Sequence, residues 1–213
     1  MIKGTLITFE GIDGSGKTTQ AQRTVKHLKR KGFDVIWLRE PGGEKASESI
    51  RKILLNKDHA SMDPLTELLL YEASRAQLTQ KVIFPALKKG KIVICDRYSD
   101  SSLAYQGYGR GLNKKWVEFL NKISTSGLTP HLTILVDVPV ELALKRKARM
   151  RKHLKKDKDR IEKEKKSFYQ KVRKGYLELA KQNKKRYVVI NGKEGIDQTW
   201  QKVKEKIDKF LKI

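Results

Sequence analysis

The chain has 213 residues, which is enough for a substantial buried core, and we expect a single domain over residues 1–213. It carries 48 lysines and arginines against 24 carboxylates, and this formal charge of +24 favours anionic ligands such as nucleotides or nucleic acid. No run of about 18 apolar residues is present, which excludes a transmembrane helix. The first apolar strand begins too early for a signal peptide, and Cys95 is the only cysteine, so we expect a cytoplasmic protein.

Apolar segments alternate with amphipathic ones along the whole chain. The predicted strands are residues 6–9, 33–38, 91–96, 131–138 and 187–190. The predicted helices are residues 19–31, 47–56, 64–85, 141–149, 168–179 and 196–210, and further helical segments bracket residues 116–120. Pro85 is expected to end or kink the third helix. This alternation predicts an α/β fold of three layers, with an open five-stranded parallel sheet flanked by helices.

A glycine-rich stretch joins the first predicted strand to the first predicted helix. It has the pattern G-x-x-x-x-G-K-T and consists of Gly11, Ile12, Asp13, Gly14, Ser15, Gly16, Lys17 and Thr18. Its glycines allow backbone amides to approach phosphate oxygens, and the helix N-terminus adds a positive dipole. Lys17 is expected to reach the β- and γ-phosphates and Thr18 to bind Mg²⁺. The stretch therefore predicts a P-loop for ATP or GTP.

Two more polar segments, Arg39 and Asp96–Arg97, directly follow predicted strands. Ligands of open parallel sheets bind beyond the carboxyl ends of the strands, so we expect both segments to meet the P-loop in one crevice. Arg97 can fork onto phosphate oxygens. Asp96 is expected either to hold Mg²⁺, directly or through water, or to pair with a neighbouring arginine.

Residues 145–166 are dominated by Lys and Arg and have few apolar side chains. Such a segment is either a lid that closes over a polyanion or an ordinary solvated pair of helices, and the nearby phosphate chemistry favours the lid. The remaining lysines are spread along predicted helices, which is more typical of a Lys-rich surface than of a nucleic-acid groove. Specific nucleic-acid binding is therefore not expected.

Motifs along almost the full length resemble those of the thymidylate kinase family. They are Phe9–Thr19, Arg39–Gly43, Tyr71–Arg75, Asp96–Tyr98, Ser101–Gly107, Asp159–Glu162 and Val172–Tyr176. The resemblance implies a P-loop kinase fold and transfer of the γ-phosphoryl group of ATP to dTMP, with Mg²⁺, in a homodimer. The alternatives are a kinase of another nucleoside monophosphate and a basic P-loop protein that binds nucleic acid.

The resemblance also implies roles for individual residues at the acceptor nucleotide. Tyr71 is expected to stack on the base, unless it is plain core, and Arg75 to bond the carbonyl edge of the base; both lie on one helix face. Tyr105 is expected beside the sugar 2′ carbon. The remaining implied contacts are Arg39 and Arg97 to the acceptor phosphate, and Ser102 and Gln106 to base and sugar.

Two further features follow from the resemblance. Asp13 is placed near the acceptor sugar or the metal, and its alternative role is to stabilise the turn. The P-loop contains no arginine, so the chain resembles family members whose catalytic arginine lies in the lid. The candidates are Arg146, Arg149 and Arg151, among which the sequence does not choose.

The sequence departs from the family pattern at two places. Glu44 and Ser47 stand where threonine and glycine are usual after Gly43, so the geometry of this acceptor-phosphate loop is left open. The lid is also longer and more basic than usual between Arg149 and Asp159.

Overall fold

A five-stranded parallel sheet forms the centre of the molecule. The computed structural model describes residues 3–155 and 157–213, so residue 156 of the predicted lid and residues 1–2 lie outside the described chain. The strands are β1 (Thr5–Glu10), β2 (Val35–Arg39), β3 (Ile92–Asp96), β4 (Leu132–Asp137) and β5 (Tyr187–Asn191). Their order is β2-β3-β1-β4-β5. The predicted five strands and their parallel arrangement are therefore confirmed.

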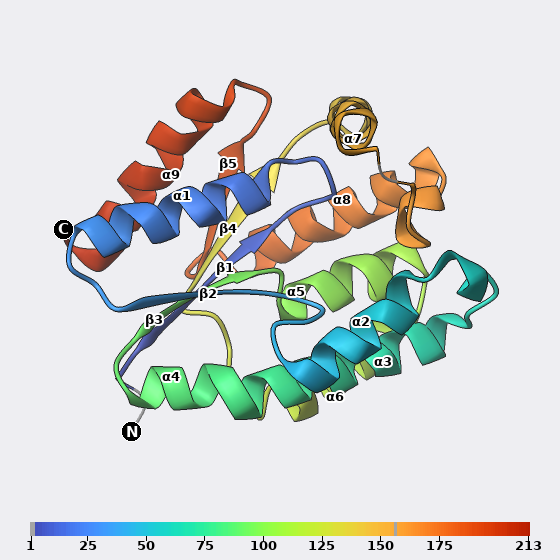
Figure 1. The fold of residues 1–213 in the computed structure, drawn as a ribbon, viewed down its shortest axis with the longest axis horizontal. Helices are drawn as coiled ribbons and strands as arrows, with labels where there is room; N and C mark the ends of the chain where they lie inside the picture. Colours follow the sequence, from blue (N-terminus) through green and yellow to red (C-terminus); the bar gives the residue numbers. More distant parts are fainter. Residues whose placement is uncertain (1–2, 156) are drawn as a thin grey trace.

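Helices cover both faces of this sheet (Figure 1). They are α1 (Lys17–Arg30), α2 (Lys45–Leu55), α3 (Pro64–Leu78), α4 (Phe84–Lys88), α5 (Ser99–Ser102), α6 (Lys114–Ser124), α7 (Val140–Leu154), α8 (Lys166–Gln182) and α9 (Ile196–Leu211). Single turns of 3₁₀ helix occur at η1 (Lys57–His59) and η4 (Ile161–Lys163), and π-helical turns at η2 (Thr79–Ile83) and η3 (Leu103–Gly109). Apolar side chains of α1 and α9 pack on one face, and α4 and α8 pack on the other.

Some helix boundaries differ from the expected ones. Pro85 was expected to end or kink its helix. The helical run does not end there but continues to Lys88, and it is interrupted by the π-turn η2 directly before α4. Residues 116–120 lie inside α6 rather than between helices. Helix α7 extends to Leu154, well into the basic segment.

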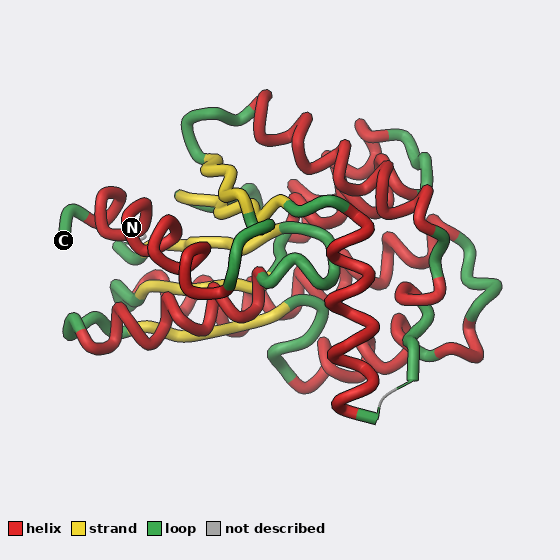
Figure 2. The backbone as a smooth tube through the Cα atoms, turned by 90° about the horizontal axis from the view of Figure 1, so that it is seen from above, coloured by secondary structure: helices red, strands yellow, loops and turns green. Residues whose placement is uncertain are grey.

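The sheet presents the carboxyl ends of its strands at one edge of the molecule. Helix α7 lies across this edge in Figure 2, so the basic segment stands directly over the residues that follow β1 and β3. Cys95 of β3 is fully buried, as expected for a small apolar residue. Among the described helices, none is long and apolar enough to cross a membrane.

Candidate active site

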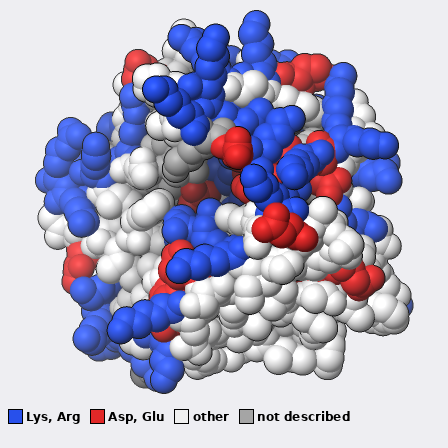
Figure 3. Space-filling view, turned by 45° about the vertical axis from the view of Figure 1, so that its right-hand side comes forward, with Lys and Arg blue, Asp and Glu red and all other residues white. Residues whose placement is uncertain are grey.

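Two cavities meet at the glycine-rich loop after β1. The inner cavity, of about 290 Å³, lies between this loop, α3 and the residues after β3. The outer cavity, of about 420 Å³, lies between the loop, α7 and the start of α9. Both are lined by Asp13, Lys17, Thr18 and Lys147. Figure 3 shows lysines and arginines gathered around a hollow that contains carboxylates. Two anionic ligands can therefore meet across one set of cations.

The loop itself has the geometry that phosphate binding requires. Gly16 has φ 96° and ends the loop directly before Lys17, the first residue of α1. Gly14 has φ 83°, and a Cβ there would clash with the Ala143 carbonyl of α7. The first turn of α1 carries no acidic side chain, so its free amides and dipole face the outer cavity without a competing carboxylate.

Arg97 connects the loop to the inner cavity. It has φ 73°, which is unusual for a residue with a side chain. Its Nη2 donates to Asp13 Oδ1 at 2.8 Å and to the Tyr105 hydroxyl at 2.9 Å, and its Nη1 donates to the Tyr176 hydroxyl at 2.9 Å. Burial would raise the pKa of Asp13, but the adjacent charges of Arg97 and Lys17 outweigh it and hold this pKa well below its usual range.

Thr18 and Asp96 form the part of the site that can hold a metal ion. The Thr18 hydroxyl donates to Asp96 Oδ2 at 2.5 Å. The other carboxylate oxygen, Oδ1, is buried and has no hydrogen-bond partner among the described residues. A hydroxyl beside one orphaned carboxylate oxygen suits Mg²⁺, which is commonly held by one or two carboxylates together with substrate phosphates. Among the described residues, no three or more His, Cys, Asp or Glu side chains are grouped so that they could hold a metal ion by themselves. An ion at Thr18 and Asp96 would therefore need substrate phosphates as further ligands.

The residues expected at the acceptor nucleotide all line the inner cavity. They are Arg39, Tyr71, Arg75, Arg97, Ser102, Tyr105 and Gln106. Tyr71 is half-buried on the cavity wall, so it is not part of the closed core. Burial raises the pKa of Tyr71, which is therefore a neutral ring at physiological pH.

The three arginines expected to act from a lid lie in different surroundings, and whether the segment closes over a ligand stays a prediction. Arg146 lines the outer cavity, but its guanidinium donates to the carbonyls of Gly192, Lys193 and Glu194 after β5. Arg149 is exposed and, within the described chain, contributes to neither of the two cavities. Arg151 is likewise outside both linings and pairs with Glu162 at 3.4 Å.

Lys147 is the lid cation that faces both cavities, and the sequence prediction did not include it. Its Nζ pairs with Glu162 of η4. The local signal for it was weak: the apolar Val140 and Ala143 at the start of α7 are buried, and Lys147 follows them on the same face of the helix.

Arg51 of α2 was also missed, although it lines the inner cavity beside Arg39. Burial and the neighbouring charge of Arg39 lower the pKa of Arg51. Ser47 and Leu54 are the buried residues of α2, and Arg51 lies between them on the same helix face. Two guanidinium groups therefore face the inner cavity from the β2 side, although the sequence had indicated only one.

The two residues that depart from the family pattern in the acceptor-phosphate loop, Glu44 and Ser47, have structural roles. Glu44 caps α2, because its carboxylate accepts from the amides of Ala46 and Ser47. The buried Ser47 hydroxyl donates to the Ser74 carbonyl of α3 at 2.9 Å. Arg39 pairs instead with Glu48, at 3.1 Å. The extra carboxylate at position 44 thus belongs to the helix start and not to the cavity lining.

Comparisons with known proteins agree with this geometry. Residues 9–203 match the family model described as thymidylate kinase. The chain belongs to the thymidylate kinase family. It is 51% identical to the thymidylate kinase of Kosmotoga olearia over 92% of both chains. It is 44% identical to that of Caldanaerobacter subterraneus over 99% of this chain and 98% of the relative.

A thymidylate kinase of known structure has the same fold. The crystal structure of the Ehrlichia chaffeensis thymidylate kinase superposes with a TM-score of 0.77 at 35% identity. The superposition covers 96% of this chain and 98% of the other chain. The three-layer fold of a P-loop kinase that the sequence predicted is therefore confirmed.

Proposed function

We propose that this chain transfers the γ-phosphoryl group of ATP to dTMP, giving dTDP and ADP. The observation that carries the proposal is the meeting of two cavities at Asp13, Lys17, Thr18 and Lys147. Phosphoryl transfer requires donor and acceptor phosphates in line, with their repulsion cancelled and without a covalent intermediate. The outer cavity takes ATP, because it includes the P-loop and the start of α1. The inner cavity takes dTMP.

Cationic groups neutralise the two nucleotides from opposite sides. Lys17 and the P-loop amides hold the donor phosphates, and Arg39 and Arg51 hold the acceptor phosphate. Arg97 lies between them and contacts the acceptor and the transferring group. Lys147 reaches the transferring group from the lid, in the role that the sequence had given to Arg146, Arg149 or Arg151. Mg²⁺, held by Thr18 and Asp96, would neutralise charge on the donor phosphates.

The wall of the inner cavity distinguishes the acceptor. We assign stacking on the base to Tyr71 and a hydrogen bond to its carbonyl edge to Arg75, with Ser102 and Gln106 as further polar contacts. Tyr105 limits the space at the sugar 2′ carbon. Asp13 orients Arg97 and Lys17, because its low pKa keeps it charged between them.

An ADP-release assay with each nucleoside monophosphate tests this assignment. We expect the highest kcat/KM with dTMP, a lower value with dUMP, and very low values with dCMP and with ribothymidine monophosphate. A better acceptor than dTMP would favour the alternative, a kinase of another monophosphate with the same fold. Omission of Mg²⁺ should abolish turnover in the same assay.

We also propose that two copies of the chain associate through α3 and α6. Exposed apolar side chains gather on these two packed helices, and Figure 3 shows a largely uncharged area from the lower centre to the lower right of the view. They are Leu65, Leu69, Trp116, Phe119 and Ile123. Such a surface is typical of a homodimer interface.

Phe119→Glu should convert the dimer to a monomer in sedimentation analysis. Val189→Glu, at an exposed apolar position of β5, should leave it dimeric. A monomeric unmodified protein would reject the proposed interface.

We also propose that the enzyme is cytoplasmic, because its one cysteine is buried and free.

A further inference from the structure

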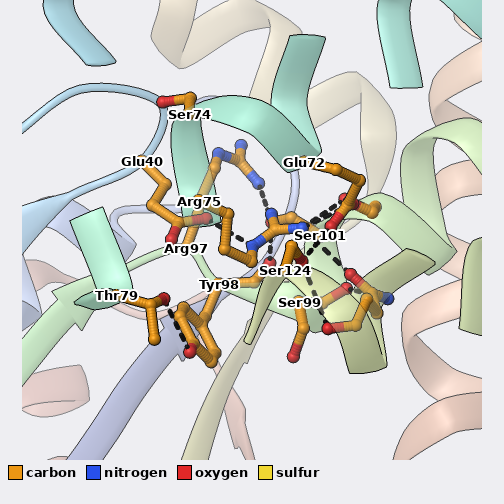
Figure 4. Close-up of polar contacts among 12 residues, drawn as sticks. Glu40, Glu72, Ser74, Arg75, Thr79, Arg97, Tyr98, Ser99, Ser101 and Ser124 are labelled. Atoms are coloured by element: carbon orange, nitrogen blue, oxygen red, sulfur yellow. Dashed lines mark hydrogen bonds and ion pairs between the residues drawn. The ribbon is translucent and has the colours of Figure 1, made fainter. Parts of the chain in front are cut away.

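The guanidinium of Arg75 is held by partners on nearly every side, and it is only 1% exposed. Its Nε donates to Glu40 at 2.8 Å, and its Nη1 donates to Glu72, Ser102 and Asn121 at 2.6–2.9 Å. Figure 4 shows Arg75 between Glu40 and Glu72, with Ser124 beside Glu72. Burial would lower the pKa of Arg75, but the two carboxylates raise it above its ordinary value, so it is always a cation.

A count of donors identifies what this arrangement leaves for a ligand. A guanidinium has five N–H groups, one on Nε and two on each Nη. The acceptors around Nε and Nη1 occupy three of them. On Nη2, the Tyr98 carbonyl at 3.2 Å takes one, and the described residues provide no acceptor for the other. Since Arg75 lines the inner cavity, this one N–H is available to a carbonyl oxygen of a bound base.

Helix α6 supplies two members of this shell, and neither of them lines the inner cavity. Asn121 is buried, and its side-chain Oδ1 accepts from Arg75 Nη1 while its Nδ2 donates to the Ser99 carbonyl at 3.0 Å. Because the amide bridges two fixed groups, it has one favourable orientation. One turn later, the Ser124 hydroxyl donates to Glu72 Oε2 at 2.5 Å and so holds the second carboxylate.

We propose that Asn121 is a positioning residue for base recognition, which fixes the plane of the Arg75 guanidinium so that its single free N–H meets the C4 carbonyl of the acceptor base. Asn121 does not line the inner cavity, so it acts through Arg75. An N–H donor held rigidly in this place favours binding of a base with a carbonyl at C4 and disfavours binding of a base with an amino group there. This inference rests on the proposed function and extends it to a residue of a helix that touches no nucleotide.

The substitution Asn121→Leu tests the inference, because leucine has nearly the same size but neither accepts nor donates a hydrogen bond. The readout is a comparison of dTMP with 5-methyl-dCMP, which has an amino group in place of the carbonyl at C4 and therefore also lacks the hydrogen on N3. We expect KM for dTMP to rise roughly tenfold, a loss of about 1.4 kcal/mol in binding, with KM for ATP unchanged. The preference for dTMP over 5-methyl-dCMP should fall by a similar factor.

The matched control is Asn113→Ala. Asn113 caps the start of the same helix by accepting from the Lys115 amide at 3.0 Å, so its loss weakens α6 without touching Arg75. We expect an unchanged preference. Equal losses in both variants, or equal increases in KM for dTMP and 5-methyl-dCMP, would reduce Asn121 to a structural residue and overturn the inference.

A second variant, Ser124→Ala, keeps the test decisive where Asn121→Leu lowers the yield of folded protein. It removes the hydroxyl that contacts both Glu72 and the Asn121 backbone carbonyl, while it leaves the Asn121 side chain in place, and we expect a smaller loss of preference in the same direction. An unchanged preference in a folded Asn121→Leu or Ser124→Ala variant contradicts the inference. The unmodified enzyme in the same assay tests the proposed function separately. If it forms no dTDP, both the proposed function and the role of Asn121 are rejected. If it is active and the variants keep its preference for dTMP, only the role of Asn121 is rejected.

Discussion

Arg97 Nη2 lies 2.8 Å from Asp13 Oδ1, and this pair joins the end of β3 to the phosphate-binding loop. The left-handed backbone at Arg97 directs its side chain toward the loop, where its two Nη groups donate to four side chains of the described residues, two of them tyrosines. A planar fork in this position can bridge the two nucleotides without losing its orientation.

Arg97→Lys should lower kcat by about 100-fold or more, the size of effect seen when one charge-stabilising donor is removed from an active site. Lysine keeps the charge but provides a single point of contact. Steady-state kinetics at saturating ATP and dTMP measures the effect. Arg173→Lys is the control, because Arg173 forms a similar fork with Asp137 but lines neither cavity. Similar rates in the two variants would remove Arg97 from the reaction.

Lys147→Met should reduce kcat by about tenfold to a hundredfold with a smaller change in KM, since the charge is needed when the phosphoryl group is in transit. Lys147→Arg should retain most of the rate. Lys145→Met, two residues earlier on the exposed side of α7, should behave as the unmodified enzyme. If Arg149→Met were the damaging lid variant and Lys147→Met were not, the assignment of Lys147 would be wrong.

Tyr71→Phe should leave KM for dTMP within about twofold, because stacking depends on the ring and not on the hydroxyl. Tyr71→Ala should raise KM for dTMP by roughly tenfold or more, as expected from a base–aromatic contact of about 1–3 kcal/mol. A calorimetric titration with dTMP in the absence of ATP measures this binding step alone. A Tyr71→Ala variant with unchanged affinity would place the base elsewhere in the inner cavity.

Glu10 gives the stability of the protein a defined dependence on pH. Burial, with a smaller contribution from Asp100, raises the pKa of Glu10 to about 7 from an ordinary value of 4.5. The folded state therefore holds a proton that the unfolded state releases between these values, so the free energy of unfolding decreases as pH rises from 4.5 to 7.

The substitution Glu10→Gln should make this decrease smaller. It will not abolish it, because burial also raises the pKa of Glu40 to about 7. Thermal unfolding at pH 5 and pH 8 provides the comparison. An equal or larger loss of Tm between these pH values in Glu10→Gln would show that Glu10 is already charged at pH 5.

The sequence allowed the sheet and the P-loop to be predicted because both depend on local patterns. Buried parallel strands are continuous apolar runs, such as residues 92–95, and a G-x-x-x-x-G-K-T stretch between strand and helix has few other uses. The convergence of Arg39, Asp96 and Arg97 on the loop followed from parallel topology alone.

The lid could not be predicted at the same level. Its side chains are almost all charged, so hydrophobic periodicity gives little information about which of them turns inward. Lys147 is directed by contacts with distant residues, namely the burial of Val140 and Ala143 against the fold and the ion pair with Glu162. The shell around Arg75 likewise joins four separate segments, namely the residues after β2, helix α3, residues 98–102 and helix α6, and no local pattern connects Asn121 with Glu40.

The close approach of Gly14 to the Ala143 carbonyl restricts how the basic helix can move. Val140 and Ala143 are buried against the rest of the fold, whereas most residues after Lys147 are exposed. The first turn of this helix is thus packed on the glycine-rich loop, so if the segment opens and closes, we expect the bend to lie beyond Ala143. A covalent cross-link between the backbones at Gly14 and Ala143 should leave nucleotide exchange intact, whereas a cross-link near the far end of the helix should slow product release.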